Sequence, residues 1–479
     1  MSVAPVMRRV IKAVCMAGFI AMPLAHAQAE STRRVAPQEI EKAAFISLQE
    51  RDPARALFYA EALAERDPDD LTPQLLMARA LRDLGRYKEA QKAARRAWSL
   101  AEDGSQKFSS ALIMAQTLSS DNKRTRAQLW LRRAVHHAPT EQLAARAKRD
   151  FKYVQQRNPW QTYLSFTLAP NSNINNGSVR DSSRLNYAIS DIVFGGPIEY
   201  TLSGASQALS GLEIGGDVKA RYRFSQTSRT AHDVNFSMAY RTFVLSSSAK
   251  DILREAKEES GSTDDLPTGS DFAYGRVSIG YRYSRLNYNG KGELIARAEL
   301  GQSWYGGASY TAFFRGGLSQ SYRPSRAHKF TLALNTEVQD GYRTYDSHKS
   351  LVTGSIGKLL ESGSSIYGAA SFGAQTSNYK DAEYGEFALR AGYVMRKPVM
   401  GAGLFFGLGT SYRDYEVSQH DASGRNDLRV TADVTAVFRQ IDYYGFNPSL
   451  TLKYERTESN IGLYDTRRLG MSVGIRSSF

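Results

Sequence analysis

The sequence lacks several features that whole classes of proteins require. Its 479 residues hold one cysteine, Cys15. A membrane-spanning helix needs about 18 consecutive apolar residues, and outside the first thirty residues no apolar run approaches that length. This excludes a polytopic helical membrane protein. The sequence also has no phosphate-binding Gly-x-x-x-x-Gly-Lys-Ser/Thr, no His-Glu-x-x-His and no Gly-x-Ser-x-Gly. We therefore expect neither an enzyme nor a bound cofactor or metal.

The first 27 residues have the pattern of a cleavable export signal. Basic residues at positions 8, 9 and 12 precede an apolar stretch at 14–24 and a small-x-small site at 25–27. The residues around Cys15 do not form a lipid-attachment box. We expect residues 1–27 to be a signal peptide and the exported chain to contain no cysteine and no disulfide.

The net charge of +14 is unevenly distributed. Residues 28–157 hold 24 basic and 17 acidic residues, a net charge of +7, whereas residues 158–479 hold 35 and 31, a net charge of +4. Acidic residues interrupt the basic ones along the N-terminal part, and an exported chain seldom meets nucleic acid, so we expect no nucleic-acid partner. An acidic or mixed-charge protein client, or anionic lipid headgroups, fits the excess better.

Residues 28–157 are predicted to form an all-α helical repeat domain. Small or apolar residues recur at offsets of 34 and 37: Ala56, Ala60 and Leu63, then Ala90, Ala94 and Ala97, then Ala127, Leu131 and Ala134. Gly85, which can take a positive φ, and Tyr87 supply a turn between two helices in the middle copy, where the third copy has Asn122 and Arg124. The pattern resembles a tetratricopeptide repeat, and a generic helical bundle remains the alternative.

Stacked helix pairs form a concave face that binds peptides or proteins. Placing the repeat on that face gives six candidate client contacts, which are Glu41, Phe45, Arg79, Arg82, Asp83 and Gln116. The alternative for Arg79 and Arg82 is that they only solvate an exposed helix face.

Residues 158–479 are predicted to form a fourteen-stranded antiparallel transmembrane β-barrel. This part holds 24 of the 27 tyrosines, and fourteen segments of alternating apolar and polar residues lie between Trp160 and Phe479. Segments of about 10 to 15 residues exceed the usual 5 or 6 of globular strands and suit tilted membrane strands. Aromatic residues at segment ends, such as Tyr443 and Tyr444, and the terminal Phe479 as a barrel-insertion signal point the same way. Both termini are expected in the periplasm, and an irregular strand within 183–207 could change the count by two.

Two polar motifs lie at opposite ends of the barrel sequence. Asn171, Ser172, Asn173, Asn175 and Asn176 follow the first segment, and Ser459 and Asn460 precede the last one. Together with the helical repeats and the fourteen segments, these motifs resemble the surface lipoprotein assembly modulator (Slam) family. The resemblance implies an outer-membrane translocon that recognises clients in the periplasm and delivers surface lipoproteins, or hemophore-like secreted proteins, to the cell surface. It also implies outer-membrane lipids and the barrel assembly machinery as partners.

The residues themselves leave two questions open. Short amides in turns cap backbone groups and tolerate left-handed conformations, so the Asn-rich motif predicts either a structured loop or a direct client contact. An exopolysaccharide-export or solute porin with a periplasmic helical scaffold is the rival function. A sugar conduit is expected to have a lumen of one charge sign, whereas the inferred lumen mixes Glu213, Asp217 and Asp433 with Lys219, Arg221 and Arg439, which favours the translocon.

Overall fold

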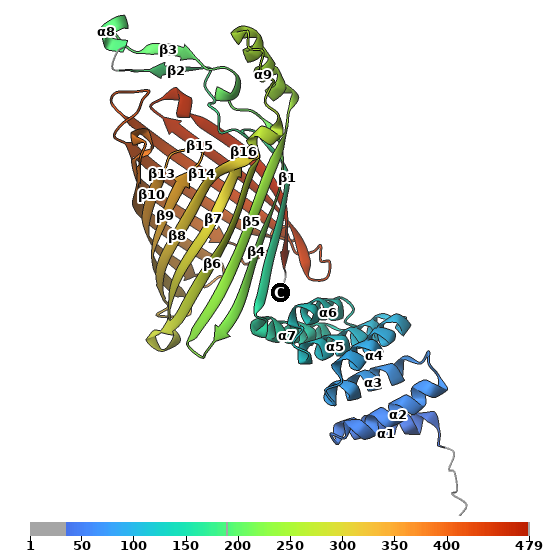
Figure 1. Ribbon diagram of the computed structural model, residues 1–479. Coiled ribbons are helices and arrows are strands. Elements are labelled where there is room, and N and C mark those ends of the chain that lie inside the picture. The colour runs from blue at the N-terminus through green and yellow to red at the C-terminus, as the bar shows by residue number, and fades with distance from the viewer. Residues whose placement is uncertain (1–34, 188–189, 478–479) are drawn as a thin grey trace, which may run out of the picture.

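The computed structural model describes residues 35–187 and 190–477 (Figure 1). The predicted signal peptide at 1–27 and the predicted insertion signal Phe479 lie outside these residues. None of the helices in the described ranges is long and apolar enough to cross a membrane.

Between residue 35 and the first barrel strand, the structure has seven helices, and consecutive helices pack on one another. They are α1 (Pro37–Gln49), α2 (Pro53–Arg66), α3 (Leu71–Asp83), α4 (Tyr87–Leu100), α5 (Gly104–Ser120), α6 (Arg124–His136) and α7 (Glu141–Arg157). Side-chain caps fix several helix starts. Asp52 accepts a hydrogen bond from the backbone N–H of Arg55 at the start of α2, and Asp103 and Gln106 form a capping box on α5.

The predicted offsets are visible in the turns between helices. Arg51, Gly85 and Asn122 each have a positive φ, of 63°, 78° and 56°, directly after α1, α3 and α5. The N–H of the next residue bonds a carbonyl five residues back in all three turns, at 2.8 Å, as in a Schellman motif. All nine recurring residues predicted to lie between the helices are buried. The helices thus recur with the predicted spacing, while a specific tetratricopeptide identity stays a prediction.

Fourteen antiparallel strands close into a barrel, as the sequence predicted. They are β1 (Trp160–Asn171), β4 (Gly211–Gln226), β5 (Thr230–Leu245), β6 (Tyr274–Asn287), β7 (Gly292–Tyr305), β8 (Ala308–Tyr322), β9 (His328–Gly341), β10 (Ser347–Leu359), β11 (Ser365–Ser377), β12 (Tyr384–Val394), β13 (Ala402–Tyr415), β14 (Arg425–Phe438), β15 (Phe446–Ser459) and β16 (Thr466–Ser477). The strands β2 (Ser182–Leu185) and β3 (Ile198–Thr201) form a separate two-stranded sheet, so the irregular region does not change the barrel count.

The two faces of the barrel wall differ as the alternation requires. Large apolar side chains such as Leu332, Phe372 and Leu408 point outward and are highly exposed. Ionisable side chains occupy the alternate, inward positions. An apolar outer band with a polar interior is the arrangement of an outer-membrane barrel.

The two ends of the barrel carry different structures. The helical domain lies at one end, together with short turns such as the one between β4 and β5 (Figure 1). The opposite end carries the long connections, which hold the β2–β3 sheet, α8 (Ser190–Phe194) and α9 (Ser247–Ser260).

Candidate functional site

The predicted client-contact residues fall into two groups on the helical domain. Arg82 Nη1 donates to Gln116 Oε1 at 2.6 Å, and its Nη2 pairs with Asp83 Oδ1 at 2.7 Å. These three residues therefore meet across α3 and α5. Glu41 and Phe45 lie one turn apart on α1 and form the second group. Arg79 lies one turn before Arg82 on α3 and is half-buried.

Exposed aromatic side chains extend the candidate surface of the helical domain. Phe45 is 48% exposed on α1, and Phe58 on α2 is 68% exposed. Phe58 packs edge-on against Tyr59, with 5.7 Å between ring centroids. Phe58 was not among the residues predicted from the sequence, although its position on the polar side of α2, out of phase with Ala56, Ala60 and Leu63, was a usable signal.

One arginine of α6 fastens the helical domain to the barrel. Arg132 Nη1 donates to the carbonyl oxygens of Tyr444 and Gly445, at 3.2 and 2.9 Å. Its guanidinium lies 4.0 Å from the centroid of the Phe446 ring and 4.8 Å from that of Phe151. Burial lowers the pKa of Arg132 below its ordinary value. The turn between β14 and β15 is thus the docking point for α6.

Two histidines complete this contact. The ring of His136 lies 4.5 Å from that of Tyr444, and His137 packs edge-on against Trp98 at 5.7 Å. Burial, with His136 and Lys107 nearby, lowers the pKa of His137. Tyr444, which the sequence placed at a strand end facing the membrane interface, therefore contacts the helical domain.

The covalent link between the two domains is short and held by hydrogen bonds. Only Asn158 and Pro159 separate α7 from β1. Asn158 Nδ2 donates to Thr125 Oγ1 at 3.0 Å, and its Oδ1 accepts from the backbone N–H of Trp160 at 3.1 Å. Asn158 is buried, so α7 continues into β1 without a flexible linker.

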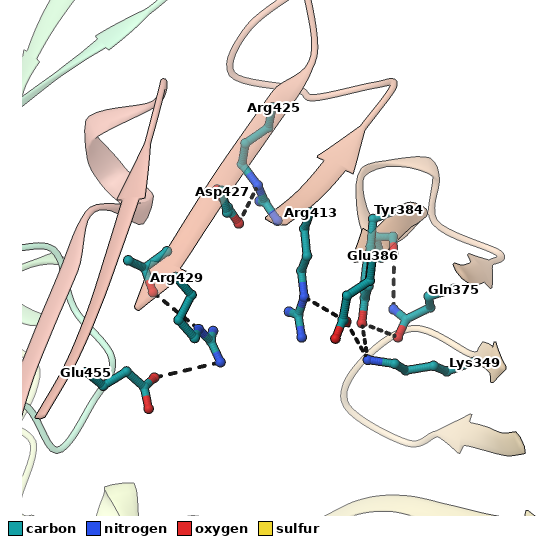
Figure 2. Close-up of polar contacts among 11 residues, drawn as sticks. Lys349, Gln375, Tyr384, Glu386, Arg413, Arg425, Asp427, Arg429 and Glu455 are labelled. Carbon is teal, nitrogen blue, oxygen red and sulfur yellow. Dashed lines mark hydrogen bonds and ion pairs between the residues drawn. The ribbon is translucent and has the colours of Figure 1, made fainter. Parts of the chain in front are cut away.

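The interior wall of the barrel is lined by paired charges (Figure 2). Glu386 Oε2 lies between Lys349 Nζ, at 2.7 Å, and Arg413 Nε, at 3.1 Å. The three residues come from β12, β10 and β13, so the cluster ties strands together through their inward faces. Tyr384 accepts a hydrogen bond from Lys349 and donates to Gln375.

The same pairing continues around the barrel. Arg429 pairs with Glu455 across β14 and β15, and Arg276 pairs with Glu299 across β6 and β7. Of the predicted lumen residues, Asp433 pairs with Arg390 at 2.6 Å. Two further residues of the predicted lumen set also form ion pairs. Glu213 pairs with Arg241 at 3.4 Å, and Arg221 pairs with Asp233 at 3.7 Å. The interior thus carries both signs of charge, as the sequence predicted.

The Asn-rich motif folds into a hydrogen-bonded loop at the end of β1 that lies away from the helical domain, which we call its outer end. Asn173 is buried, donates to the Gly177 carbonyl at 2.8 Å and accepts from the Gly177 N–H at 3.0 Å. Asn171 Nδ2 donates to Glu213, and Asn175 bonds the backbone of residues 205, 207 and 209. Asn176 has a positive φ of 57°, the left-handed conformation that asparagine tolerates. The structured-loop interpretation accounts for these contacts, and a client contact by the motif stays a prediction.

This loop joins the beginning and the end of the barrel. Leu469 N–H donates to Ser172 Oγ at 2.8 Å, Arg468 Nε donates to the Asn173 carbonyl at 2.8 Å, and Arg468 also bonds Asn176. Further along, Arg180 Nε pairs with the buried Asp465 at 2.5 Å. We call these contacts, between residues 172–180 and 465–469, the clasp.

The second polar motif supports the clasp from the neighbouring connection. Asn460 Nδ2 donates to the Gly424 carbonyl at 3.1 Å, and Asn460 Oδ1 accepts from the N–H of Asn426 at 2.9 Å. Ser459 Oγ accepts from the N–H of Ile461, which is fully buried. Both motifs therefore organise one end of the barrel although they are nearly 300 residues apart.

The histidines of the barrel sequence are dispersed. His232 bonds Tyr281, His348 bonds Thr336 and His420 lies near Tyr187. Within the described ranges, no group of three or more His, Cys, Asp or Glu side chains could hold a metal ion.

Comparisons with known proteins address the fold and the family. The chain resembles the translocator chaperone SycD of Yersinia enterocolitica type III secretion at 15% identity, over 25% of this chain and 92% of that one, with a TM-score of 0.23. It also resembles an outer-membrane channel from Pseudomonas putida at 11% identity, over 66% of this chain and 95% of that one, with a TM-score of 0.32. OmpT of Vibrio cholerae matches at 7% identity, over 67% and 98%, with a TM-score of 0.33.

No curated protein matches the sequence. The model of the family described as surface lipoprotein assembly modifier matches residues 160–479, which are 320 of the 479 residues. The match covers the whole closed barrel together with both polar motifs. The family prediction made from those motifs is confirmed, and the chain belongs to the surface lipoprotein assembly modifier family.

Proposed function

We propose that this protein carries surface lipoproteins from the periplasm to the cell surface. In this proposal, the helical domain binds the client on the periplasmic side and the barrel passes the client, or its lipid anchor, outward. Family membership supports the role in surface lipoprotein assembly. A secreted, hemophore-like protein without a lipid is the second kind of client that the family resemblance implies.

The observation that carries the proposal is the way the helical domain is fastened. Helix α7 runs into β1 through two residues, and Arg132 binds the turn between β14 and β15. Outer-membrane barrels have their short turns in the periplasm. A domain held against such a turn faces newly exported proteins and lies directly beneath the barrel.

The proposed client surface consists of the predicted residues together with Phe58. Exposed aromatic residues such as Phe45 and Phe58 supply apolar contact area, and Glu41, Arg79 and the Arg82 cluster supply charge. The predicted net charge of +7 for residues 28–157 favours an acidic or mixed-charge client. The outward apolar side chains of the barrel contact membrane lipid, and insertion is expected to use the barrel assembly machinery.

Protease shaving of intact cells tests the proposal. Cells would express a candidate surface lipoprotein with the intact chain, with the Asn171→Ala/Asn173→Ala form, or with no copy. We expect client exposure in the first cells and its loss in the last. Unchanged exposure without any copy, with a fall in polysaccharide secretion or solute uptake, would favour the porin function instead.

A second experiment isolates the helical domain as the receptor. Client capture by the purified full chain should weaken several-fold on Phe45→Ala. The matched control is Tyr200→Ala, which removes an aromatic residue of somewhat greater exposure at the opposite end of the molecule, on β3. Equal capture by both variants would refute the assignment of Phe45 to the client surface.

A further inference from the structure

The barrel is closed by one pair of strands that hardly pair. Every other neighbouring pair runs in register over at least ten residues. Between β1 and β16, the residues that the structure describes hold a single register pair, Asn171 with Gly470. The two strands remain neighbours beyond this pair, and continuing its register places residues 166–170 opposite 471–475 without a ladder. We call this stretch the seam.

Pro170 gives a local reason for the loss of pairing. The N–H of Ser172 points to β16, because it donates to the Leu469 carbonyl at 3.1 Å. Alternate residues of a strand point their N–H groups the same way, so residue 170 also faces β16. Proline has no N–H to donate there, and the ladder ends at its position.

The inward side of the seam also lacks the charge pairs that tie several other neighbouring strands. Continuing the register from Asn171 and Gly470 places Ala169 and Thr167 inward on β1, opposite Ser472 and Gly474 on β16. Within the described ranges, no ion pair joins β1 to β16. Neighbouring strands elsewhere are tied by pairs such as Arg413 with Glu386.

The outward side of the seam is apolar throughout. Phe166 and Leu168 on β1, and Val473 and Ile475 on β16, are 49–67% exposed toward the membrane. The seam therefore separates a polar interior from lipid by two strands that share neither a ladder nor an ion pair.

Contacts at both ends keep the seam shut. The clasp joins the outer ends of β1 and β16. At the inner end, the helical domain continues into β1 on one side and, through Arg132, holds the turn leading into β15 on the other. Since β15 pairs with β16 over their whole length, the helical domain bridges the two sides of the seam.

We propose that the seam is a client-interaction site at which the barrel opens laterally, and that its occupant is an extended, lipid-bearing segment of the client lipoprotein. This inference rests on the proposed function. Unpaired backbone groups facing lipid are costly, and an extended peptide satisfies them by adding to the strand edges. Small inward residues leave room for that peptide, while the apolar outer rim lets an acyl chain pass directly into the membrane.

A reversible cross-link tests the site. Ala169→Cys with Ser472→Cys closes the seam in a chain whose exported part is predicted to contain no other cysteine. The matched control, Thr451→Cys with Ser472→Cys, links β15 to β16, where the two residues are already in register. Both cysteine pairs are oxidised to disulfides in cells whose surface display of a lipoprotein depends on this protein. We expect closure of the seam to reduce protease-accessible client at least tenfold, reductant to restore it, and the control to change nothing. Equal display in both oxidised variants would overturn the proposal.

Hydrogen exchange on the purified full chain reports on the seam without any client. Amides of residues 471–475 that face β1 should exchange at least tenfold faster than amides of the paired β15 strand. Equal protection would overturn the inference even if translocation is confirmed. Conversely, unchanged client display in cells without the protein would refute the proposed function, whereas the exchange result would stand.

Discussion

Arg132 holds the helical domain against the barrel, and its replacement by methionine should release the domain. The substitution keeps an unbranched side chain beside Phe151 and Phe446 but removes the guanidinium. Hydrogen bonds from a charged group are each worth about 1.5–3 kcal/mol, and a cation over an aromatic ring adds about 0.5–2 kcal/mol. Burial opposes these gains, because it disfavours the charged form of Arg132 and lowers its pKa. We therefore expect docking to weaken by about 2–3 kcal/mol, which is a factor of about 30 to 150.

Hydrogen exchange in the purified full chain measures this effect. The turn between β14 and β15 should exchange faster by that factor in Arg132→Met, while the ladder of β14 and β15 keeps its protection. Arg133→Met is the matched control. Arg133 is the next residue of α6, and its guanidinium lies over Trp130 at 4.2 Å, inside the helical domain. Its loss should leave the turn unchanged.

One outcome would contradict this role of Arg132. If the turn exchanges at the wild-type rate in both variants, Arg132 does not hold the domain in place. Arg132→Lys adds a graded test, because it retains a charge but loses the forked geometry that reaches two carbonyl oxygens. Its exchange rate should lie between those of the wild type and Arg132→Met.

Three further predictions concern the clasp, the interior wall of the barrel and His137 in the helical domain. Gly177→Ala should raise proteolysis of the loop 172–210 in intact cells and leave the barrel folded, since an added Cβ would lie 2.0 Å from the carbonyl oxygen of Gln207; loop cleavage at the wild-type rate would contradict this. Glu386→Gln should destabilise the barrel by about 1–2 kcal/mol in urea unfolding, because two cations lose their partner, whereas the surface control Glu383→Gln should shift nothing measurable. Burial in the folded helical domain, with His136 and Lys107 nearby, lowers the pKa of His137, so the folded domain binds fewer protons than the unfolded chain and its stability should fall as pH drops below about 6.5; a pH-independent unfolding midpoint of the domain would refute this.

Much of the fold was predictable because its patterns are local. Alternation with a period of two marks a strand with one lipid face and one polar face, and it gave all fourteen barrel strands. The repeat offsets were readable from small residues, and even the third copy fits, because Asn122 adopts the positive φ that Gly85 has in the second. Asparagine can replace glycine there, so the apparent departure from the pattern preserves the turn.

The contacts between distant segments were not predictable from the sequence. Arg132 lies more than 300 residues from Tyr444, and nothing in its helical pattern distinguishes it from Arg133. Likewise, the Asn-rich motif predicted a turn but not its partners, because Arg468 and Asp465 become neighbours only when the barrel closes. Which strand pair would lack a ladder was also hidden, although Pro170 was a usable local signal.

Closure without a ladder makes the two end contacts decisive for the barrel. A membrane barrel normally closes by backbone hydrogen bonds along its full seam, because each unpaired polar group in hydrocarbon costs several kcal/mol. Among the residues that the structure describes, the seam lacks those bonds, and the clasp and the helical domain hold its two ends. A client bound to the helical domain would therefore act on the same domain that holds the inner end of the seam. Binding of the client and opening of the barrel can thus be coupled through the contact between Arg132 and the turn that joins β14 to β15, without a separate signalling element.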